Sequence, residues 1–318
     1  MDQFLINFNT SLDSHKGAES IFHDAIDAGL TNIVDLFLTS TKYKFLSSHA
    51  AIMLACRKGH VDIVKLLLAA NKHIIPEVAA GNLLLREAVQ NGHAGVVRLL
   101  LFASANIKRV DSNAKPGVLI SDAARNGHLG VVEVLLADKR VDPGANDNAA
   151  IQLAAAFGYT DIVKLLLADK RVDPGANDNY AILKAAKNGH AAVVELLLKA
   201  SIKDRRVDPS AAGNYAVAMA AANGHVFVVC ALLADKRVDP SARNNYAIRT
   251  AAANGHVAIV RFLLTDDRVD PRAENNEARR YAHASGHKKV VAVLDSWVAP
   301  EFTVDVPRGT KRLVINFK

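Results

Sequence analysis

A glycine, followed in most cases by histidine, recurs at a nearly fixed interval along almost the whole chain. Consecutive glycines of this series are 30, 33, 35, 31, 31, 35, 31 and 31 residues apart. The series consists of Gly29, Gly59, Gly92, Gly127, Gly158, Gly189, Gly224, Gly255 and Gly286. Such a period is typical of a solenoid, in which each unit can bury its apolar face only against its neighbours. We therefore expect one elongated domain rather than a single globular core.

Each unit contains two stretches whose apolar residues recur with a helical period. In the unit 244–274 the first stretch is lined mainly by alanine and the second by leucine, valine and phenylalanine. Gly255 lies where a left-handed residue would end the first helix, and Asn244 and Asn245 are the expected N-caps. Each unit is therefore expected to be a helical hairpin. Because alanine lets the first helices approach closely, the array should be concave on their side.

The repeated pattern, G-H followed by V-V-x-L-L after a helix that ends in A-A, resembles the ankyrin repeat. The resemblance implies an all-α, ankyrin-type α-solenoid of about nine helical-hairpin repeats over residues 18–298. It also implies projecting β-turn fingers and a non-enzymatic scaffold that binds a protein partner through these fingers and the concave first-helix face. The 31-residue R-V-D-P form further resembles arrays encoded by amoebae and by the giant viruses that infect them, which would place the protein in a host cytoplasm.

Two features depart from the family pattern. The family's T-P-L-H tetrapeptide is replaced by the run Tyr246 to Arg249, so an asparagine cap would have to start the helix instead. The regular unit of 31 residues is two residues shorter than the usual repeat, and the missing residues fall in the finger. We therefore expect short fingers.

The two ends of the chain lie outside the repeats. Residues 1–17 form an N-terminal segment, and residues 299–318 change to an alternating pattern. Phe302, Val304 and Val306 alternate with polar residues before a turn, which predicts a small C-terminal β-hairpin. We expect this hairpin to cap the last repeat. The alternative is an edge strand offered to another chain.

The histidines are expected to be structural rather than catalytic or metal-binding. Seven of them occupy one slot after the recurrent glycine, namely His60, His93, His128, His190, His225, His256 and His287. One ligand in each repeat would not converge on an ion, and no C-x-x-C motif accompanies them. The chain also lacks a G-x-x-x-x-G-K phosphate loop and a G-x-S-x-G nucleophile elbow. We therefore expect no enzyme activity, no metal and no cofactor.

An aspartate before proline recurs in the fingers, each time two residues after an arginine. The aspartates are Asp142, Asp173, Asp208, Asp239 and Asp270. Repeated Asp-Pro is first of all turn chemistry. The alternative is a ladder of charges along the fingers.

Positions that differ between repeats are the candidates for partner binding. They lie on the first helices or on the turns that follow them: Arg57, Lys58, Gln90, Arg125, Gln152, Phe157, Tyr159, Lys187, Asn188 and Arg249. Phe157 replaces an asparagine found in five repeats, and Tyr159 replaces the histidine. Two aromatic residues on one turn favour an interface anchor. Packing against the neighbouring turn explains them equally well.

Two insertions interrupt the period, one near 104–116 and one near 199–204. They are interpreted as longer fingers, which either reach a partner or are tolerated surface loops.

The net charge of +7 is concentrated near the C-terminus, where residues 272–318 hold nine Lys and Arg against five Asp and Glu, a balance of +4. A basic end favours an acidic partner, so nucleic acid or another polyanion is the alternative to a protein partner. The simpler interpretation is a solvated terminal cap.

Composition and targeting signals place the protein inside a cell. Cys56 and Cys230 lie five repeats apart, too far to pair at about 10 Å for each helix layer, which favours a reducing compartment. The sequence contains no secretory signal pattern and no apolar run long enough to span a membrane. We therefore expect a cytoplasmic monomer that does not bind membranes, and nuclear entry stays open.

Overall fold

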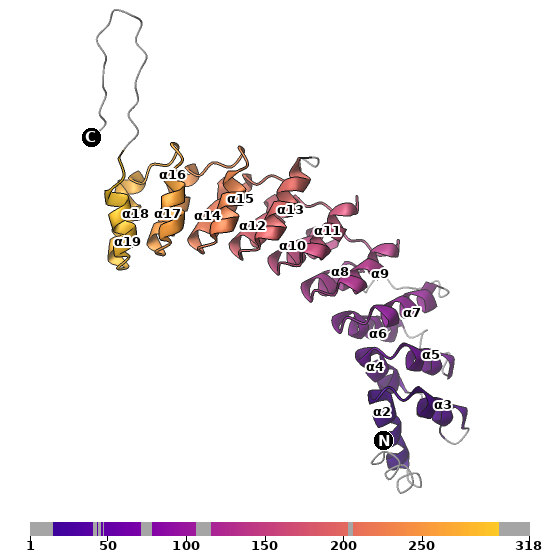
Figure 1. Cartoon of the computed structure of the whole chain (residues 1–318). Helices are drawn as coiled ribbons and strands as arrows, with labels where there is room; N and C mark the ends of the chain where they lie inside the picture. The colour runs from indigo at the N-terminus through magenta and orange to yellow at the C-terminus, as the bar shows by residue number, and fades with distance from the viewer. Residues whose placement is uncertain are drawn as a thin grey trace, which may run out of the picture. The chain divides into compact units, whose positions relative to one another are not determined.

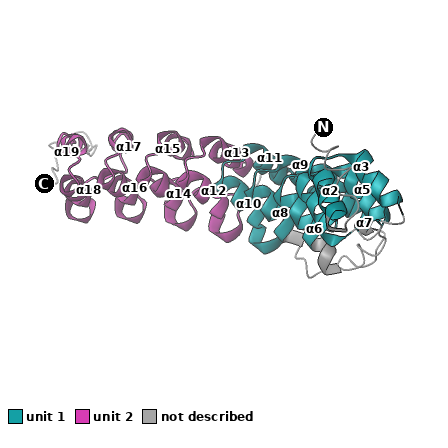
Figure 2. Ribbon diagram, turned by 90° about the horizontal axis from the view of Figure 1, so that it is seen from below, with its two compact units in different colours: residues 1–173 teal, residues 174–318 magenta. Residues whose placement is uncertain are grey.

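The computed structural model describes a chain of helices. The described residues are 15–40, 43, 46, 48–70, 78–105, 116–202 and 206–298, and they form eighteen helices and no strand. The predicted hairpin at 299–318 and most of the predicted N-terminal segment lie outside the described residues. The chain divides into two compact units, unit 1 (residues 1–173) and unit 2 (residues 174–318) (Figure 2).

Unit 1 arranges its described helices in two rows (Figure 1). The first helices of the hairpins are α2 (His15–Asp27), α4 (His49–Lys58), α6 (Val78–Gln90), α8 (Pro116–Arg125) and α10 (Ala145–Ala156). The second helices are α3 (Thr31–Thr39), α5 (Val61–Ala70), α7 (Ala94–Ala105), α9 (Leu129–Ala137) and α11 (Thr160–Ala168). Each helix contacts its hairpin partner and the neighbouring helices of its own row.

Unit 2 repeats the arrangement. Its first helices are α12 (Ala176–Lys187), α14 (Ala211–Ala222), α16 (Ala242–Ala253) and α18 (Ala273–Ala284). Its second helices are α13 (Ala191–Ser201), α15 (Val226–Leu233), α17 (Val257–Leu263) and α19 (Lys288–Asp295). The predicted hairpin of two helices in each repeat is confirmed in both units.

The core of each unit lies between the two rows of helices. In α16 the buried stripe is mainly alanine, as at Ala251 and Ala252, whereas in α17 it consists of Ile259, Val260 and Leu263. These side chains are buried by the other helix of their own hairpin and by the adjacent repeats, so each hairpin depends on its neighbours for stability. The predicted division between alanine-lined and leucine-lined helices is confirmed.

From α10 onward the first helices begin with a left-handed turn. In α16, residues 243–245 have φ of 55°, 56° and 60° and ψ of 46°, 51° and 39°. The same three-residue turn opens α10, α12, α14 and α18. A left-handed residue with a side chain costs roughly 1–2 kcal/mol, and asparagine adopts this conformation more readily than most. Contacts elsewhere must therefore offset this cost.

The asparagine at the end of this left-handed turn supplies one such contact. Asn245 accepts a hydrogen bond at Oδ1 from the backbone N–H of Asp270, in the next finger, over 2.8 Å. The equivalent bonds join Asn148 to Asp173, Asn179 to Asp208, and Asn214 to Asp239. The prediction that Asn244 and Asn245 cap their own helix is wrong, because the left-handed turn directs the Asn245 side chain toward the next repeat.

A second contact between repeats comes from the finger arginine. The Arg171 guanidinium pairs with Asp169, two residues earlier, and donates to the carbonyl oxygen of Val141 in the preceding finger over 2.9 Å. Arg237 and Arg268 bond in the same way to the carbonyl oxygens of the preceding fingers. The arginine thus stabilises the conformation of its own finger and links it to the finger of the preceding repeat.

The aspartates before proline make turns. Asp239 Oδ1 accepts hydrogen bonds from the backbone N–H and the hydroxyl of Ser241, and Asp142 Oδ1 accepts from the backbone N–H of Gly144. The turn interpretation is confirmed. The finger arginines form their ion pairs with a different aspartate, the one two residues before each arginine.

The finger pairs predict a defined acid sensitivity. Hydrogen bonding to Arg171 lowers the pKa of Asp169, and the same cause lowers the pKa of Asp138, Asp235 and Asp266. A carboxylate whose pKa is lowered in the folded state stabilises the fold above its unfolded pKa of about 3.9. This stabilisation is lost as the pH falls through the lower, folded-state pKa.

Replacing Asp169 by asparagine is therefore expected to reduce the free energy of unfolding by about 0.5–1 kcal/mol at neutral pH. Its loss of stability below about pH 4 should be shallower than that of the wild type. Denaturant unfolding across this pH range measures both effects. Asp161→Asn, at an exposed carboxylate on α11, is the matched control. Identical pH profiles for the two variants would show that the finger pair contributes nothing.

The two insertions lengthen second helices. α7 has 12 residues and α13 has 11, whereas α9 and α11 have nine each. The first residues of each insertion therefore continue the second helix of their repeat. For these residues the interpretation as longer fingers is wrong. Residues 106–115 and 203–205 lie outside the described part of the chain.

The two cysteines are free thiols. Cys56 is buried, and desolvation raises the pKa of its thiol to about 12, with a smaller contribution from Glu87. None of the described helices is both long and apolar enough to cross a membrane.

Candidate partner-binding surface

The turn between the two helices of a repeat is built on the recurrent glycine. Gly255 has φ of +78°, and its N–H donates to Ala252 O while the N–H of His256 donates to Ala251 O. These two bonds form a Schellman motif, which ends the helix and satisfies its last carbonyl groups. The predicted left-handed residue at this position is confirmed.

The histidine after the glycine joins adjacent repeats. The Nε2 of His256 lies 3.0 Å from the carbonyl oxygen of Ala222, and because a carbonyl can only accept, the nitrogen donates. The same ring lies over Gly224, where a Cβ would be 2.7 Å from Cε1. Equivalent bonds are made by His60, His93, His128, His225 and His287. Their predicted structural role is confirmed.

Tyr159 takes the histidine's place on one of these turns. Its ring covers Gly127, where a Cβ would lie 2.7 Å from the tyrosine Cε1. Phe157 stacks on Tyr159 with ring centroids 6.3 Å apart and an interplanar angle of 28°, yet 52% of Phe157 is exposed. Tyr159 is thus a packing residue in part, whereas Phe157 presents much of its ring to solvent.

Some candidate positions of unit 1 lie on successive turns. Gln90 and Arg125 are the last residues of α6 and α8, and Phe157 directly follows α10. All three are exposed, and these consecutive first helices pack side by side. We call Gln90, Arg125, Phe157 and Tyr159 the unit 1 rim. The rim combines a cation, an amide and two aromatic rings at one end of the first helices.

Other candidates are already engaged within the chain. Arg57 pairs with Glu87, and Lys58 pairs with Asp27. Gln152 donates from Nε2 to the carbonyl oxygen of Asp147. These three side chains link or brace repeats of unit 1, so binding a partner would require them to exchange a bond.

Arg249 in unit 2 is the most strongly held of the candidates. Its guanidinium pairs with Glu277 of the next first helix over 2.5 Å, and the two side chains are only 16% and 15% exposed. It also lies over the Tyr246 ring, 5.7 Å from the centroid. Arg249 therefore connects α16 to α18. Lys187 and Asn188 of the same unit are exposed at the end of α12.

The structure adds a row of tyrosines that the search for differing positions missed. Tyr180, Tyr215 and Tyr246 follow the asparagine of the left-handed turn in consecutive first helices of unit 2. Lys184 lies 4.7 Å from the centroid of the Tyr180 ring, and Arg243 lies 5.0 Å from that of Tyr215. The signal was the repeated tripeptide Asn-Tyr-Ala, which is shared between repeats and so escaped a comparison of their differences.

The basic C-terminal end is paired in part among its described residues. Arg272 pairs with Asp270, Arg279 pairs with Asp295, and Arg280 donates to the carbonyl oxygen of Glu274. Arg272 also lies over the ring of Trp297. Lys288 and Lys289 are exposed at the start of α19, and the other basic residues of this end, beyond 298, lie outside the described residues. The ion pairs of Arg272 and Arg279 reduce the positive surface on which the polyanion alternative depends, while Lys288 and Lys289 still contribute to it.

The comparisons with known proteins agree with this geometry. A family model of ankyrin repeats, in three copies, matches residues 22–111, 85–178, 120–211, 151–244 and 217–297. These overlapping stretches together run from 22 to 297 and so cover most of the chain. No curated protein matches it. Among the described residues, no group of three or more His, Cys, Asp or Glu side chains could hold a metal ion.

Proposed function

The chain belongs to the ankyrin-repeat family, and on that premise we propose that it is a non-enzymatic scaffold whose unit 1 rim binds a protein partner. Ankyrin repeats are generally protein-interaction modules. The observation that carries this proposal is the 52% exposure of Phe157 on a turn where sister repeats have asparagine. The part of the ring that stays exposed does not contribute to folding and would add favourable apolar burial if a partner covered it.

The neighbours of Phe157 suit an interface. Aromatic residues and arginine supply most of the energetic hot spots in protein interfaces, and Arg125 lies on the adjacent turn. Tyr159 supports Phe157 from beneath and is itself fixed on Gly127. The ring is thus held in place before a partner arrives, which reduces the entropy lost on binding.

The fixed contacts between repeats support the same proposal. The histidine, asparagine and finger arginine bonds recur with the period of the chain, whereas the rim residues do not. Shared positions hold the stack, and differing positions that make no ion pair between repeats are the better candidates for recognising a partner. Lys187 extends this reasoning to unit 2, whereas Asn188 has the asparagine that five repeats share. Arg249 ranks lowest because Glu277 already pairs with it.

Replacing Phe157 by asparagine together with Tyr159 by histidine is expected to weaken partner capture about 30-fold, the loss that corresponds to a hot spot of about 2 kcal/mol. The melting temperature should stay the same or rise, since both changes restore residues that sister repeats use. The measurement is capture of the partner from lysate of the native host, treated with nuclease, at low and high salt.

Phe227→Ala is the matched control, because Phe227 is 82% exposed and lies on the second helix α15. It should leave capture unchanged. A double variant that melts earlier and captures equally well would assign Phe157 and Tyr159 to packing. Retention of nucleic acid that persists at physiological salt would favour the polyanion alternative instead, since non-specific binding of polyanions weakens steeply with salt.

A further inference from the structure

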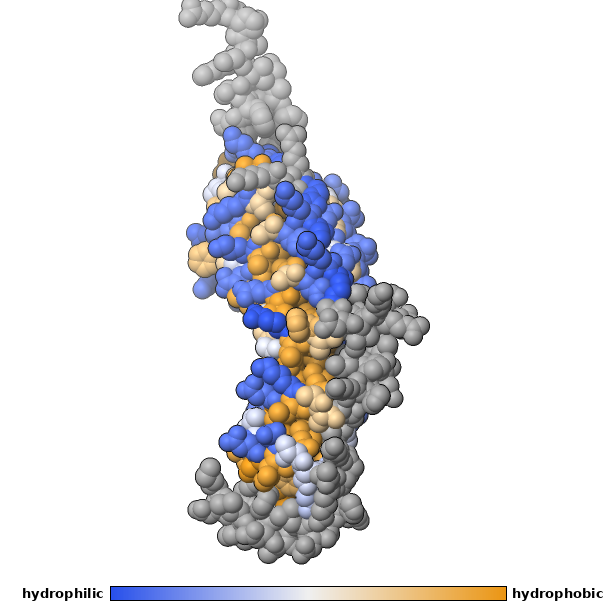
Figure 3. Space-filling model, turned by 90° about the vertical axis from the view of Figure 1, so that its right-hand side faces the viewer, coloured by the Kyte–Doolittle hydropathy of each residue, from blue (hydrophilic) through white to orange (hydrophobic). Residues whose placement is uncertain are grey.

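The second helices of unit 1 carry an exposed apolar surface that is separate from the unit 1 rim. On the side where α3, α5 and α7 lie, hydrophobic side chains form a column that is bordered along one side by hydrophilic ones (Figure 3). Leu36 on α3 is 60% exposed and Phe102 on α7 is 73% exposed. Phe102 occupies the position that in α9 is Ala137, the last residue of that helix. α7 therefore presents an exposed aromatic ring where its neighbour has only a methyl group.

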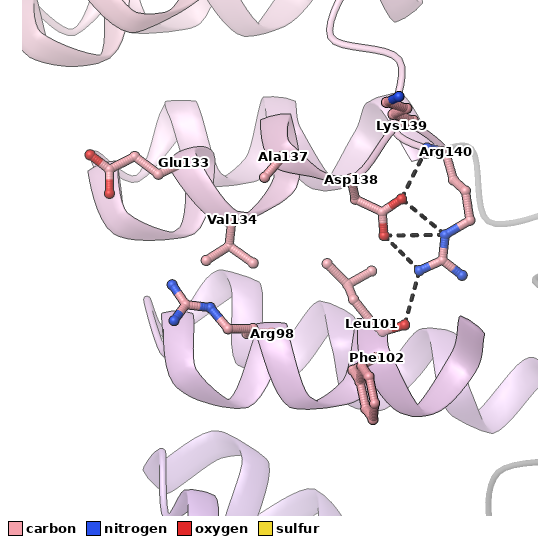
Figure 4. Close-up of a pocket in the computed structure, with 9 residues that line it drawn as sticks. All are labelled: Arg98, Leu101, Phe102, Glu133, Val134, Ala137, Asp138, Lys139 and Arg140. Carbon is pink, nitrogen blue, oxygen red and sulfur yellow. Dashed lines mark hydrogen bonds and ion pairs between the residues drawn. The ribbon is translucent and has the colours of Figure 1, made fainter. Parts of the chain in front are cut away.

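A groove of about 530 Å³ lies between α7 and α9 (Figure 4). Its apolar part is formed by Leu101, Phe102, Val134 and Ala137. Leu101 and Val134 point toward each other across it (Figure 4). This volume falls in the range of sites that hold a ligand, although a groove along two helices is better suited to a peptide.

The sequence contributes to the groove at one position. In unit 1 this position of the second helices carries leucine at Leu36, Leu66, Leu99 and Leu165, but α9 has Val134 there. Valine is smaller than leucine by one methylene group, which is a small part of the groove's volume. Replacing Val134 by leucine should therefore narrow the groove without filling it.

Charge determines what can enter. Arg98 and Glu133 lie together at one end of the groove and have opposite charges, and at the other end Asp138 and Arg140 pair with each other over 2.6 Å (Figure 4). Lys139 at that second end adds one positive charge to the lining. The groove is thus apolar along its length and basic at the end near Lys139.

We infer that the groove between α7 and α9 binds a short amphipathic helix of a protein partner, with its apolar face on Leu101, Phe102 and Val134 and an acidic side chain beside Lys139. Two neighbouring helices form the kind of groove in which a third helix lays its apolar stripe. At the second end of the groove Asp138 already pairs with Arg140, so Lys139 is the remaining charge there. An acidic side chain of the partner would pair with Lys139. This surface lies on second helices and is independent of the proposed rim site.

The test uses a stapled helical peptide of about 15 residues, with leucines spaced i, i+3, i+4 and i+7 and glutamates on the flanks. A second peptide carries lysines on the flanks. The full chain is labelled at its methyl groups, and shifts of the Leu101 and Val134 resonances are followed by NMR. The glutamate peptide should saturate these shifts and bind about tenfold more tightly than the lysine peptide.

Three variants locate the site, and the first two have a control inside the chain. Phe102→Ala should weaken binding of the glutamate peptide about tenfold, whereas Phe227→Ala, at another exposed phenylalanine on α15, should not. Lys139→Glu should abolish the preference for the glutamate peptide, whereas Lys170→Glu, at the same position of the next finger, should retain it. Val134→Leu should narrow the groove, weaken binding and leave the melting temperature unchanged.

Equal affinity for the two peptides, or equal losses in Phe102→Ala and Phe227→Ala, would overturn the proposal, because apolar contact alone would then explain the binding. Methyl shifts at Leu101 that grow with protein concentration, without peptide, would assign the groove to a second copy of the chain and overturn it as well.

Discussion

Replacing Gly224 by alanine is expected to lower the free energy of unfolding by about 3 kcal/mol. Gly224 has φ of +81°, which costs an alanine roughly 1–2 kcal/mol. The new Cβ would also lie 2.7 Å from the ring of His256 and displace that ring. The displacement breaks the hydrogen bond from His256 to the carbonyl oxygen of Ala222, which costs about a further 0.5–1.5 kcal/mol. Denaturant unfolding followed by circular dichroism measures the loss.

Gly286→Ala separates the two contributions. Gly286 has φ of +75° and ends α18 in the same way, but no described atom lies within 4 Å of the Cβ position. This control should therefore lose only the conformational part, roughly 1–2 kcal/mol. If the two glycine variants lose equal stability, the histidine contact does not hold adjacent repeats together.

Replacing Asn245 by alanine is expected to cost about 2–3 kcal/mol. Asn245 is 9% exposed, and its removal leaves the part-buried N–H of Asp270 without an acceptor, a loss of about 1–3 kcal/mol. Alanine also adopts the left-handed conformation less readily than asparagine. Denaturant unfolding measures the total, and hydrogen exchange at the Asp270 amide reports the broken bond directly.

Asn276→Ala is the matched control for this prediction. Asn276 has nearly the same φ, 58° against 60°, but it is exposed at the last described first helix. Its replacement should cost well under half as much. Asn245→Asp keeps an acceptor oxygen in place and should recover part of the stability. Equal losses at 245 and 276 would mean that the bond to the next finger is unimportant.

The periodic features of the fold were predictable from the sequence because they depend on local chemistry. A helical apolar period and a glycine that accepts a left-handed conformation act within one hairpin, and Gly255 ends α16 as predicted. The single slot shared by the histidines was enough to identify them as structural. Their actual partner, a carbonyl oxygen of the preceding repeat, could not be derived, because it depends on how two hairpins stack.

The features that the sequence did not predict depend on a neighbouring repeat or on loop geometry. Asn245 looks like an N-cap because asparagine before a helix usually is one, but three left-handed residues send its amide to Asp270. Arg171 stands two residues from aspartates on both sides, and its pairing with Asp169 is a matter of loop geometry that spacing leaves undecided.

The candidate site was predictable only as a set of differing positions. Comparing repeats located Phe157, which is half-exposed, but it also selected Arg57 and Arg249, which vary because each pairs with a carboxylate of the next repeat. Positions that vary between repeats thus include both candidate partner-binding residues and residues that form ion pairs specific to individual repeats. Separating them required the structure, as did finding the groove beside Val134.

Hydrogen exchange of the full chain, with and without its captured partner, tests the rim as the binding surface most directly. The account predicts slower exchange in the turns 90–93, 125–128 and 156–159 of unit 1 when the partner is bound. The second helices α3, α5 and α11 should exchange as before. Protection confined to the second helices or to residues 286–298, with the three turns unchanged, would contradict it.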